Sequence, residues 1–448
     1  MSSPAACRTA VRVLIDPSAY WNRNIGDMAM LQVALARLRS FWPQAVIEVM
    51  TLDPRFLQRL DPEIRSLDPY GSLGWSADAV LVGRSVRLSA SLGYLLETCR
   101  GLRRRTKWLM TSIGRAALLV TGQDPRLVSL YLDAVRRADL VLMTGAGILN
   151  ESFKRYAFVR LETLELAMEA GASTVLLGQG IGPISDPKLQ LRAAQVLSRV
   201  DLLALRDGAA SLGLLNAMGV LASRIRVTGD DAVAIAYCAR QEAVGSAIGI
   251  NLRSAFYAGV EQRLAREIGR IVRDAADRHG APLVPLPISR HPEEDDLRTI
   301  HAMLDDASIP RDAEGGPRTP DEFLSLLPQC RIVVAGSYHA AVLALSMGIP
   351  TVGIACSDYY VHKFRGLADQ FGSDCRVELT SDPAFHTRLQ AAIDAAWVAA
   401  EEARPRLLSA AHRQMVKSEA AYGDLFALVE ARRRRSTRIK WSAATRHI

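Results

Sequence analysis

The chain has 448 residues, of which 49% are hydrophobic and 23% charged, and its formal net charge is +8. This composition is typical of a globular protein with a large core, and it excludes collagen-like, mucin-like and largely disordered chains. The basic excess is concentrated in residues 84–126, with nine basic and two acidic residues, and in residues 432–448, with seven basic residues and no acidic one. Because the rest of the chain is mildly acidic, we expect any contact with a polyanion or a membrane in those two segments.

The sequence also bears on the cellular compartment. No stretch reaches the roughly 18 uninterrupted apolar residues of a spanning helix, and residues 1–12 lack the apolar core of a signal peptide. The six cysteines form no Cys-x-x-Cys pair and have no histidine at metal-ligand spacing, which favours reduced thiols and no metal site. We therefore expect a cytoplasmic protein, which the two basic segments hold at the inner face of the cell membrane.

Short apolar runs alternate with helical patterns along most of the chain. The expected strands, in chain order, are 11–15, 46–50, 79–82, 140–144, 174–177, 202–205, 225–227, 247–251, 283–286, 332–335, 351–354 and 376–379. Because these runs are apolar throughout and do not alternate, they predict parallel sheets that are covered on both faces. Twelve strands are too many for one ordinary doubly wound sheet, so we expect an α/β fold with two Rossmann-like domains.

A polar stretch rich in small residues, at 238–246, marks the expected domain boundary. The N-terminal Rossmann-like domain is expected to span 1–238 and the C-terminal one 246–400, with a cleft between them. A C-terminal helix over 401–431 and a basic disordered tail over 432–448 are expected to follow.

Residues 84–126 form a basic amphipathic insert in the N-terminal domain. Leucines at helical spacing are followed by Arg103, Arg104 and Arg105 and then by Trp108. One interpretation is a surface that contacts an anionic membrane, with tryptophan at the interface. The other is an ordinary helix pair with solvated arginines, and the sequence leaves both open.

Candidate ligand contacts were sought where strands end, because doubly wound sheets bind ligands beyond the carboxyl ends of their strands. After the first strand, Gly26 permits close approach of a ligand, and Asp27 is either a helix cap or a base that acts on an acceptor. Gly145 and Gly147 follow the fourth strand. They suit a backbone turn against a ligand but lack the third glycine of a dinucleotide fingerprint.

The next strand ends add polar candidates. Gln179 and Gly180 follow the fifth strand in an open glycine-rich loop, where the amide can donate and accept hydrogen bonds. Arg206 ends the sixth strand beside a helix start, which suits an anion site, although a salt bridge with Asp207 is the plainer interpretation.

Asp230 and Asp231 follow the seventh strand. With no third ligand near them in sequence, one is expected to cap a helix, and no metal site is predicted. In the second half, Arg253 ends a strand and Lys363 offers a further phosphate contact. His339 lies in the first turn of a helix, where the positive end of the helix dipole favours anionic neighbours; a packing or capping role is the alternative.

Taken together, these segments resemble the polysaccharide pyruvyl transferase family over about residues 11–380. The matching pieces are NIGD at 24–27, TGAGILN at 144–150, LLGQGIGPI at 176–184, ALRDGAAS at 204–211, VTGDDA at 227–232, NLR at 251–253, YHAAVLALSMGIPTVGI at 338–354 and YYVHKFRGLADQFG at 359–372. Each piece is weak alone, and the ordered set is specific.

The resemblance implies a fold of two Rossmann-like halves, similar to the GT-B glycosyltransferases. It implies transfer of a pyruvyl group from phosphoenolpyruvate to two hydroxyls of one sugar, as a cyclic ketal. The implied acceptor is a glycan or lipid-linked oligosaccharide of exopolysaccharide or cell-envelope synthesis, and no metal or redox cofactor is required.

This chemistry assigns roles to the candidates. Arg206, Arg253 and Lys363 are available to bind the phosphate and carboxylate of the donor. His339 is the expected general acid or phosphate ligand, and Asp27 a base for the attacking hydroxyl. The remaining residues expected in the substrate site are Gly26, Gly145, Gly147, Gln179, Gly180 and Ser337.

One position departs from the family pattern. Where the family commonly has Ser-Arg-aromatic-His, this chain has Gly336-Ser337-Tyr338-His339. Ser337 therefore replaces an arginine, and a contact to phosphate or carboxylate is lost unless another base supplies it.

Two other functions fit parts of the sequence less well. A nucleotide-sugar glycosyltransferase of the GT-B type requires a carboxylate that holds the donor ribose in the second half, and no clear candidate is present. A non-catalytic or nucleic-acid-binding protein is weakly favoured by the basic tail. The acidic body and the lack of a basic, aromatic-rich sheet count against it, so no nucleic-acid partner is expected.

Overall fold

The computed structural model describes residues 10–444, apart from 18, 77–106, 146, 254–259, 293 and 305–315. Its first half is built on a parallel sheet in the order β3-β2-β1-β4-β5-β6-β7. The strands are β1 (Arg12–Asp16), β2 (Val46–Met50), β3 (Arg65–Leu67), β4 (Leu140–Met143), β5 (Ser173–Gln179), β6 (Leu202–Leu205) and β7 (Ile225–Val227). In this Rossmann-type order the chain reverses direction across the sheet between β1 and β4.

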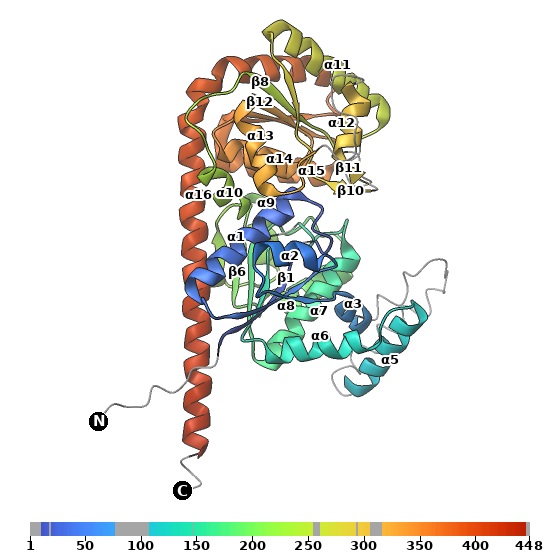
Figure 1. The fold of residues 1–448 in the computed structure, drawn as a ribbon, viewed down its shortest axis with the longest axis vertical. Helices are drawn as coiled ribbons and strands as arrows, with labels where there is room; N and C mark the ends of the chain where they lie inside the picture. Colours follow the sequence, from blue (N-terminus) through green and yellow to red (C-terminus); the bar gives the residue numbers. More distant parts are fainter. Residues whose placement is uncertain are drawn as a thin grey trace, which may run out of the picture.

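Helices cover both faces of this sheet (Figure 1). They are α1 (Ile25–Phe41), α2 (Pro54–Leu60), α3 (Tyr70–Trp75), α5 (Lys107–Val120), α6 (Arg126–Arg137), α7 (Lys154–Ala170), α8 (Pro187–Leu197), α9 (Ala209–Ala217) and α10 (Ala232–Cys238), with a 3-10 turn at Ala222–Arg224. The central strands β4 and β6 are buried along their whole length, as their continuous apolar sequences predict.

The second half contains a smaller parallel sheet in the order β14-β13-β12-β8-β9. Its strands are β8 (Ala247–Asn251), β9 (Leu283–Pro285), β12 (Cys330–Ala335), β13 (Thr351–Ala355) and β14 (Cys375–Leu379). The order is that of a flavodoxin-like doubly wound sheet, and it reverses between β8 and β12.

The other elements of the second half lie around this sheet. The helices are α11 (Gln262–His279), α12 (Asp296–Leu304), α13 (Pro320–Leu326), α14 (Tyr338–Ser346) and α15 (Asp358–Phe371), with 3-10 turns at Leu327–Gln329 and Gly372–Asp374. A short antiparallel hairpin consists of β10 (Arg290–His291) and β11 (Glu294–Asp295). The prediction of an α/β protein with two Rossmann-like halves is confirmed.

Helix α16 (Phe385–Ala444) runs along one side of both halves (Figure 1). Its first part packs into the core under the second sheet through Leu389 and Ile393. Further along, Tyr422 and Leu425 join the core under the first sheet. One helix therefore contributes to the hydrophobic cores of both halves.

The end of α16 differs from the sequence-based expectation of a separate helix at 401–431 and a disordered tail from 432. The helix is continuous through both boundaries and ends at Ala444. Arg432 donates to Asp201 Oδ1 at 3.0 Å, and Arg433 lies 3.7 Å from Asp139 Oδ1. The first two arginines of the basic run thus pair with carboxylates of the first half.

Other expectations differ in detail. The expected strand at 79–82 lies outside the described residues, as do residues 84–106 of the basic insert and the side chain of Trp108. Edge strand β3 was not predicted, because two of its three residues are exposed and polar. No helix in the described part of the chain is long and apolar enough to span a membrane.

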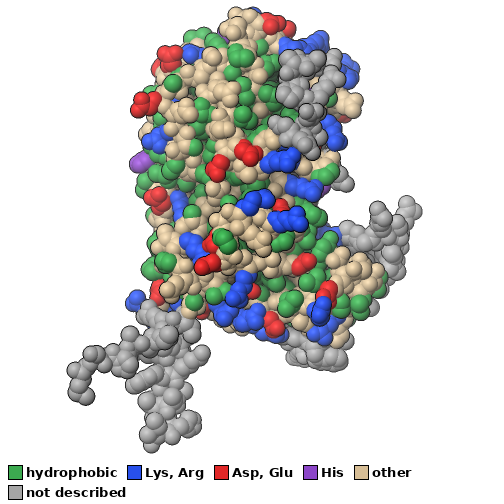
Figure 2. Space-filling model, in the orientation of Figure 1, with side chains coloured by type: hydrophobic (Ala, Val, Ile, Leu, Met, Phe, Trp, Pro, Cys, Tyr) green, Lys and Arg blue, Asp and Glu red, His purple; other side chains and the backbone are tan. Residues whose placement is uncertain are grey.

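On the face drawn in Figure 2, Lys and Arg side chains lie among Asp and Glu side chains over both halves. Among the described residues on that face, positive and negative side chains are thus interspersed.

Candidate active site

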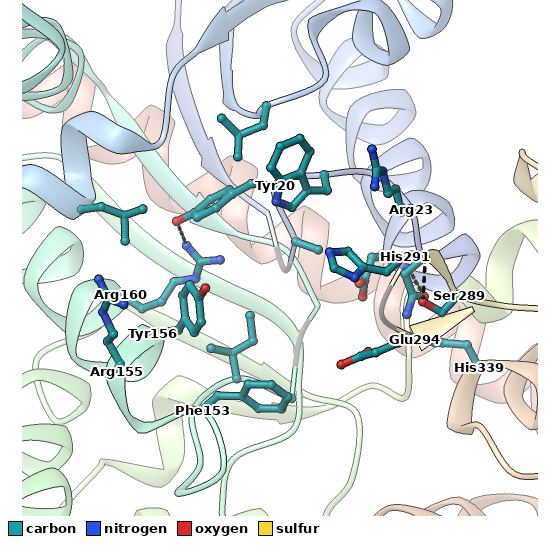
Figure 3. Close-up of a pocket in the computed structure, with 18 of the residues that line it drawn as sticks. Tyr20, Arg23, Phe153, Arg155, Tyr156, Arg160, Ser289, His291, Glu294 and His339 are labelled. Carbon is teal, nitrogen blue, oxygen red and sulfur yellow. Dashed lines mark hydrogen bonds between the residues drawn. The ribbon is translucent and has the colours of Figure 1, made fainter. Parts of the chain in front are cut away.

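A cavity of about 620 Å³ opens between the two halves (Figure 3). It lies at the carboxyl ends of the strands, where each sheet reverses its strand order, as expected for doubly wound sheets. The cavity wall contains six of the residues predicted from sequence: Asp27, Gly147, Arg206, Arg253, His339 and Lys363. Segments up to 336 residues apart are thus brought together from both halves.

His339 lies in the first turn of α14 and is only 8% exposed. Its ring packs directly on the backbone of α1 in the other half. A Cβ atom on Gly26 would lie 2.0 Å from His339 Cγ, so only glycine fits at this position. Gly26 therefore contributes by giving the histidine room and does not itself line the cavity.

Asp27 lines the cavity and does not cap α1. The cap is Asn24, whose Oδ1 accepts from the backbone N–H groups of Gly26 at 3.0 Å and Asp27 at 3.3 Å. The interpretation of Asp27 as the helix cap is therefore wrong, and its carboxylate is available to the cavity.

Asp230 is a site residue that the sequence reasoning missed. Its Oδ2 lies 3.6 Å from His339 Nε2 and 3.6 Å from Arg206 Nη1, and its side chain is buried. Burial alone would raise the pKa of Asp230, but His339 and Arg206 lower it below its ordinary value. The Asp230 carboxylate thus lies between the His339 ring and the Arg206 guanidinium.

Arg206 is almost fully buried at the end of β6. Its guanidinium lies 4.3 Å from the centroid of the Tyr338 ring, across the boundary between the halves. The expected salt bridge with Asp207 is not among the ion pairs of the described residues. Asp207 Oδ1 instead accepts from Ser211 Oγ at 2.8 Å.

Two glycines let the chain pass close to this arginine. A Cβ on Gly147 would lie 2.7 Å from Arg206 Nη2, and one on Gly180 would lie 2.8 Å from Arg206 Nε. The guanidinium therefore lies directly against backbone, so larger residues at either position would displace it.

Lys363 reaches the cavity from α15. Its Nζ lies 4.0 Å from the centroid of the Tyr359 ring. Burial, together with the neighbouring Arg206 and Arg253, lowers the pKa of Lys363 well below its usual range, and Asp27 opposes this shift. A buried ammonium beside two arginines favours an anionic ligand, which would offset the repulsion.

Arg253 is held by a buried carboxylate. Its Nε and Nη2 donate to the two carboxylate oxygens of Asp296 at 2.9 and 3.0 Å. Asp296 also accepts from Asn251 Nδ2 at 3.0 Å, which ties the end of β8 to α12. The guanidinium is thus fixed in orientation and largely neutralised, in contrast to Lys363.

Three predicted residues lie behind the cavity wall. Gly145 packs against Met30, with its Cβ position 2.3 Å from the sulfur. The Gln179 amide donates to Thr144 O at 2.6 Å and links the ends of β4 and β5. Ser337 is buried at the start of α14. The structure does not bring these three residues to the cavity surface.

The other end of the cavity is aromatic and was not predicted. Figure 3 shows Tyr20, Arg160 and Tyr156 on one side, opposite His291 and Glu294. The Arg160 side chain is buried and bonded to Tyr20. The signal in the sequence was the aromatic pair Tyr20-Trp21 in the loop between β1 and α1.

Arg160 also bonds Asp16 at the end of β1, and it donates to Pro17 O at 2.6 Å. Burial raises the pKa of Asp16, and Arg160 opposes that shift. The network anchors the chain segment that carries the aromatic side chains.

The hairpin β10–β11 bridges the two halves beside the cavity. Arg290 N donates to Arg23 O at 2.8 Å, and Ile25 N donates to Ile288 O at 2.9 Å. His291 and Glu294 line the cavity from this hairpin. The hairpin is too short to leave a strand pattern in the sequence, which is why it was missed.

Comparison with known proteins identifies the family. The model of the polysaccharide pyruvyl transferase family matches residues 24–358. The chain belongs to this family. This pyruvyl transferase family member is therefore a transferase, and the resemblance found in its motifs is confirmed. No curated protein matches its sequence significantly.

Solved structures show how the halves of this pyruvyl transferase family member are arranged. A protein from Listeria monocytogenes described as a UDP-N-acetylglucosamine 2-epimerase is 13% identical; the match covers 94% of this chain and 96% of that one, with a TM-score of 0.55. A UDP-glucosyltransferase from Polygonum tinctorium is 11% identical, with 95% and 100% covered and a TM-score of 0.51. At these identities the similarity shows the fold alone, and it confirms the expected GT-B-like arrangement.

Proposed function

We propose that the protein transfers the pyruvyl group of phosphoenolpyruvate to two hydroxyls of one sugar, forming a cyclic ketal. The acceptor is a glycan or lipid-linked oligosaccharide precursor of an exopolysaccharide or of the cell envelope. The observation that carries this proposal is the convergence of His339, Arg206, Lys363 and Asp27 on one cavity between the halves. A cation cluster beside a proton donor and a carboxylate suits an anionic donor and a hydroxyl acceptor.

The donor carries a phosphate and a carboxylate, so it requires several cations. Arg206 and Lys363 both lie against Gly147 and over the Tyr338 ring, and Arg253 is fixed by Asp296. They offer the charge that the missing arginine at Ser337 would have supplied. Burial lowers the pKa of Lys363, and the negative charge of a bound donor would favour the protonated form of this side chain again.

The chemistry requires one acid and one base. In the proposed reaction, His339 donates a proton to the methylene carbon of the donor while a sugar hydroxyl adds to the neighbouring carbon and Asp27 accepts its proton. The second hydroxyl then adds to that carbon as the bond to the phosphate oxygen breaks. Inorganic phosphate leaves with the second hydroxyl proton, and no metal or redox cofactor takes part.

The aromatic end of the cavity is the proposed acceptor site. Trp21 and Tyr156 are about half exposed there, beside Phe153. Aromatic rings pack well on the apolar faces of sugars while hydroxyl groups find polar partners at the ring edges. His291 and Glu294 on the opposite wall provide such partners.

The charge distribution and the exposed end of α5 support a proposal for the location of the enzyme. Helix α5 contributes Ala117 and Leu118 to the cavity wall, and its next two residues, Leu119 and Val120, are exposed by 62% and 87%. We propose a cytoplasmic enzyme that contacts the anionic inner face of the membrane through the basic segments 84–126 and 432–448. This position would bring lipid-linked acceptors to the cavity.

A donor panel tests the function. The protein is incubated with a nitrophenyl glycoside or a lipid-linked sugar and with either phosphoenolpyruvate or nucleotide-sugars. Release of phosphate that requires both phosphoenolpyruvate and the acceptor is expected, and His339→Gln should abolish it while His386→Gln, on the surface beside Glu267, should not. Sugar transfer from a nucleotide-sugar without consumption of phosphoenolpyruvate would refute the proposal.

A further inference from the structure

The buried side chains of Arg206, Asp230 and His339 lie together beside the proposed reaction centre, and each has a polar atom without a hydrogen bond. Within the described part of the chain, Arg206 Nε, Asp230 Oδ2 and His339 Nε2 have no hydrogen-bond partner. The carboxylate oxygen lies 3.6 Å from the histidine nitrogen, just beyond hydrogen-bond distance. Buried unsatisfied groups are costly and rare, so three of them at one point call for a functional explanation.

We propose that Asp230 is a positioning residue for His339: its carboxylate, carried by the first half, orients the imidazole of the second half and favours its protonated form. This inference rests on the proposed function, in which His339 is the general acid. A shift of less than 1 Å between the halves, about the difference between 3.6 Å and an ordinary bond, would form the hydrogen bond. The hydrogen bond between Asp230 and His339 would then form when the two halves close on the donor.

The charges around His339 support this assignment. Asp230 and Arg206 face the ring from the first half, and Asp27 lies one residue beyond the glycine on which the ring packs. In the second half, the Tyr338 ring lies edge-on to the His339 ring, and Lys363 Nζ lies 5.7 Å from the centroid of that tyrosine ring. Among the described residues, Asp230 is the one carboxylate within 4 Å of the ring nitrogen, and its negative charge favours an imidazolium there.

The adjacent carboxylate, Asp231, has a structural role. Asp231 points away from the cavity and accepts from Ser418 Oγ at 2.6 Å and Tyr422 Oη at 3.1 Å, both on α16. Gly229, with φ of +89°, allows this turn, and its Cβ position lies 2.2 Å from Gln414 Oε1. The long helix therefore fixes the loop that carries Asp230.

In the proposed reaction, Asp230 has an electrostatic role. It neither gains nor loses a proton; it stabilises the imidazolium of His339 before that proton moves to the donor carbon, as a carboxylate does in a histidine–aspartate pair. Loss of such a partner typically lowers turnover by about 10²- to 10⁴-fold without loss of the fold.

The test compares Asp230→Asn with wild type in two measurements. The titration of His339 is followed by NMR of the histidine side chains, its signal assigned with His339→Gln among the eight histidines. Without the carboxylate, the imidazole is expected to lose its proton at a pH lower by about one unit or more. The decline of kcat towards high pH, where the acid is deprotonated, is expected to move to lower pH by the same amount.

Asp231→Asn is the matched control, because it changes the adjacent carboxylate with the same chemistry. It is expected to lower thermal stability and to leave both the NMR midpoint of His339 and the high-pH decline of kcat in place. A purely structural role for Asp230 would produce the same pattern in Asp230→Asn, and that outcome would overturn the inference.

The measurements distinguish failure of the proposed function from failure of the proposed pairing of Asp230 with His339. If wild type releases no phosphate from phosphoenolpyruvate with any acceptor, but the His339 midpoint moves in Asp230→Asn, the proposed function is wrong and the pairing of the two residues stands. If wild type is active and the midpoint does not move, the pairing is wrong and the proposed function stands.

Discussion

His339 holds its position because a glycine from the other half lies beneath its ring. Any side chain at residue 26 would collide with the imidazole, since even a methyl group would lie 2.0 Å from Cγ. The contact couples a backbone position in α1 to the orientation of the proposed acid. A displacement of about 1 Å at a reacting group can cost a hundredfold in rate.

Gly26→Ala tests this contact. We expect kcat to fall by about tenfold to a hundredfold, because the imidazole must move away from the donor. Gly423→Ala is the control, since a Cβ there meets no atom within 4 Å, and it should keep full activity with slightly higher stability. Steady-state phosphate release measures both, and full activity of Gly26→Ala would contradict the described packing.

Lys363 provides a pH-dependent prediction. Burial and the neighbouring arginines lower its pKa in the free protein, and an anionic donor should raise it again. At a pH between the pKa of Lys363 in the free protein and its pKa in the complex, Lys363 gains a proton when the donor binds. The affinity for phosphoenolpyruvate should therefore fall by up to about tenfold per pH unit as pH rises.

The measurement is titration calorimetry with phosphoenolpyruvate above pH 7, where titration of the donor phosphate is nearly complete. Lys363→Met should bind more weakly and lose the pH dependence, because the titrating group is gone. An unchanged slope in this variant would show that another group takes up the proton.

At this scale the sequence predicted residues of the family motifs that follow strands, either in the next loop or in the next helix. His339, Arg206 and Lys363 line the cavity as expected. Asp230 was missed because, in the sequence, two adjacent carboxylates before a helix indicate a cap. Its pairing with a histidine 109 positions away depends on how the two halves meet, which no local pattern records.

Among the elements, α5 brings the basic insert to the wall of the cavity. Figure 1 shows it at the edge of the first half, away from α16. Leu118 is buried on the cavity side, while Leu119 and Val120 are exposed. Exposed aliphatic side chains beside a substrate cavity, in a basic segment, suit a contact with an anionic bilayer.

A double variant, Leu119→Asp with Val120→Asp, tests that contact. Binding to vesicles that contain anionic phospholipid should weaken by at least about tenfold, because the variant loses two apolar side chains and gains two negative charges. Val398→Asp on α16, which is 78% exposed, is the control and should bind as wild type does. Co-sedimentation measures both, and equal binding of the double variant and wild type would refute a role of α5 at the membrane.

The elements that the sequence failed to predict are those with few apolar residues. Strand β3 lies at a sheet edge, where polar residues are favoured, and the hairpin β10–β11 is held by backbone bonds to the other half. Both owe their structure to tertiary pairing, whereas the central strands are apolar enough to be recognised on their own.

Across the whole molecule, α16 joins the two halves. It supplies side chains to the cores under both sheets, and it holds the loop that carries Asp230 through Asp231. Because the cavity lies between the halves, their relative placement is a condition for the site. The sequence predicted a helix in this region but divided it, since composition alone cannot show that one helix spans two cores.

Tyr422→Phe tests the link between α16 and the site. The variant keeps the buried ring and removes the hydroxyl that donates to Asp231, so a buried carboxylate oxygen loses its partner. We expect a loss of about 1 to 3 kcal/mol in the free energy of unfolding. Urea unfolding measures it, with Tyr237→Phe, on the partly exposed Tyr237 beside Arg240, as the control. Equal stability of Tyr422→Phe and wild type would contradict this role of the hydroxyl.

The central claim is that this cavity joins one pyruvyl group to two hydroxyls of one sugar. It is tested most directly by ¹³C NMR of the product formed from phosphoenolpyruvate labelled at its second carbon. The labelled carbon is expected to become a ketal carbon bonded to two oxygens of the acceptor, with one phosphate released per ketal formed. Label that stays in phosphoenolpyruvate, while a nucleotide-sugar glycosylates the same acceptor, would contradict the claim.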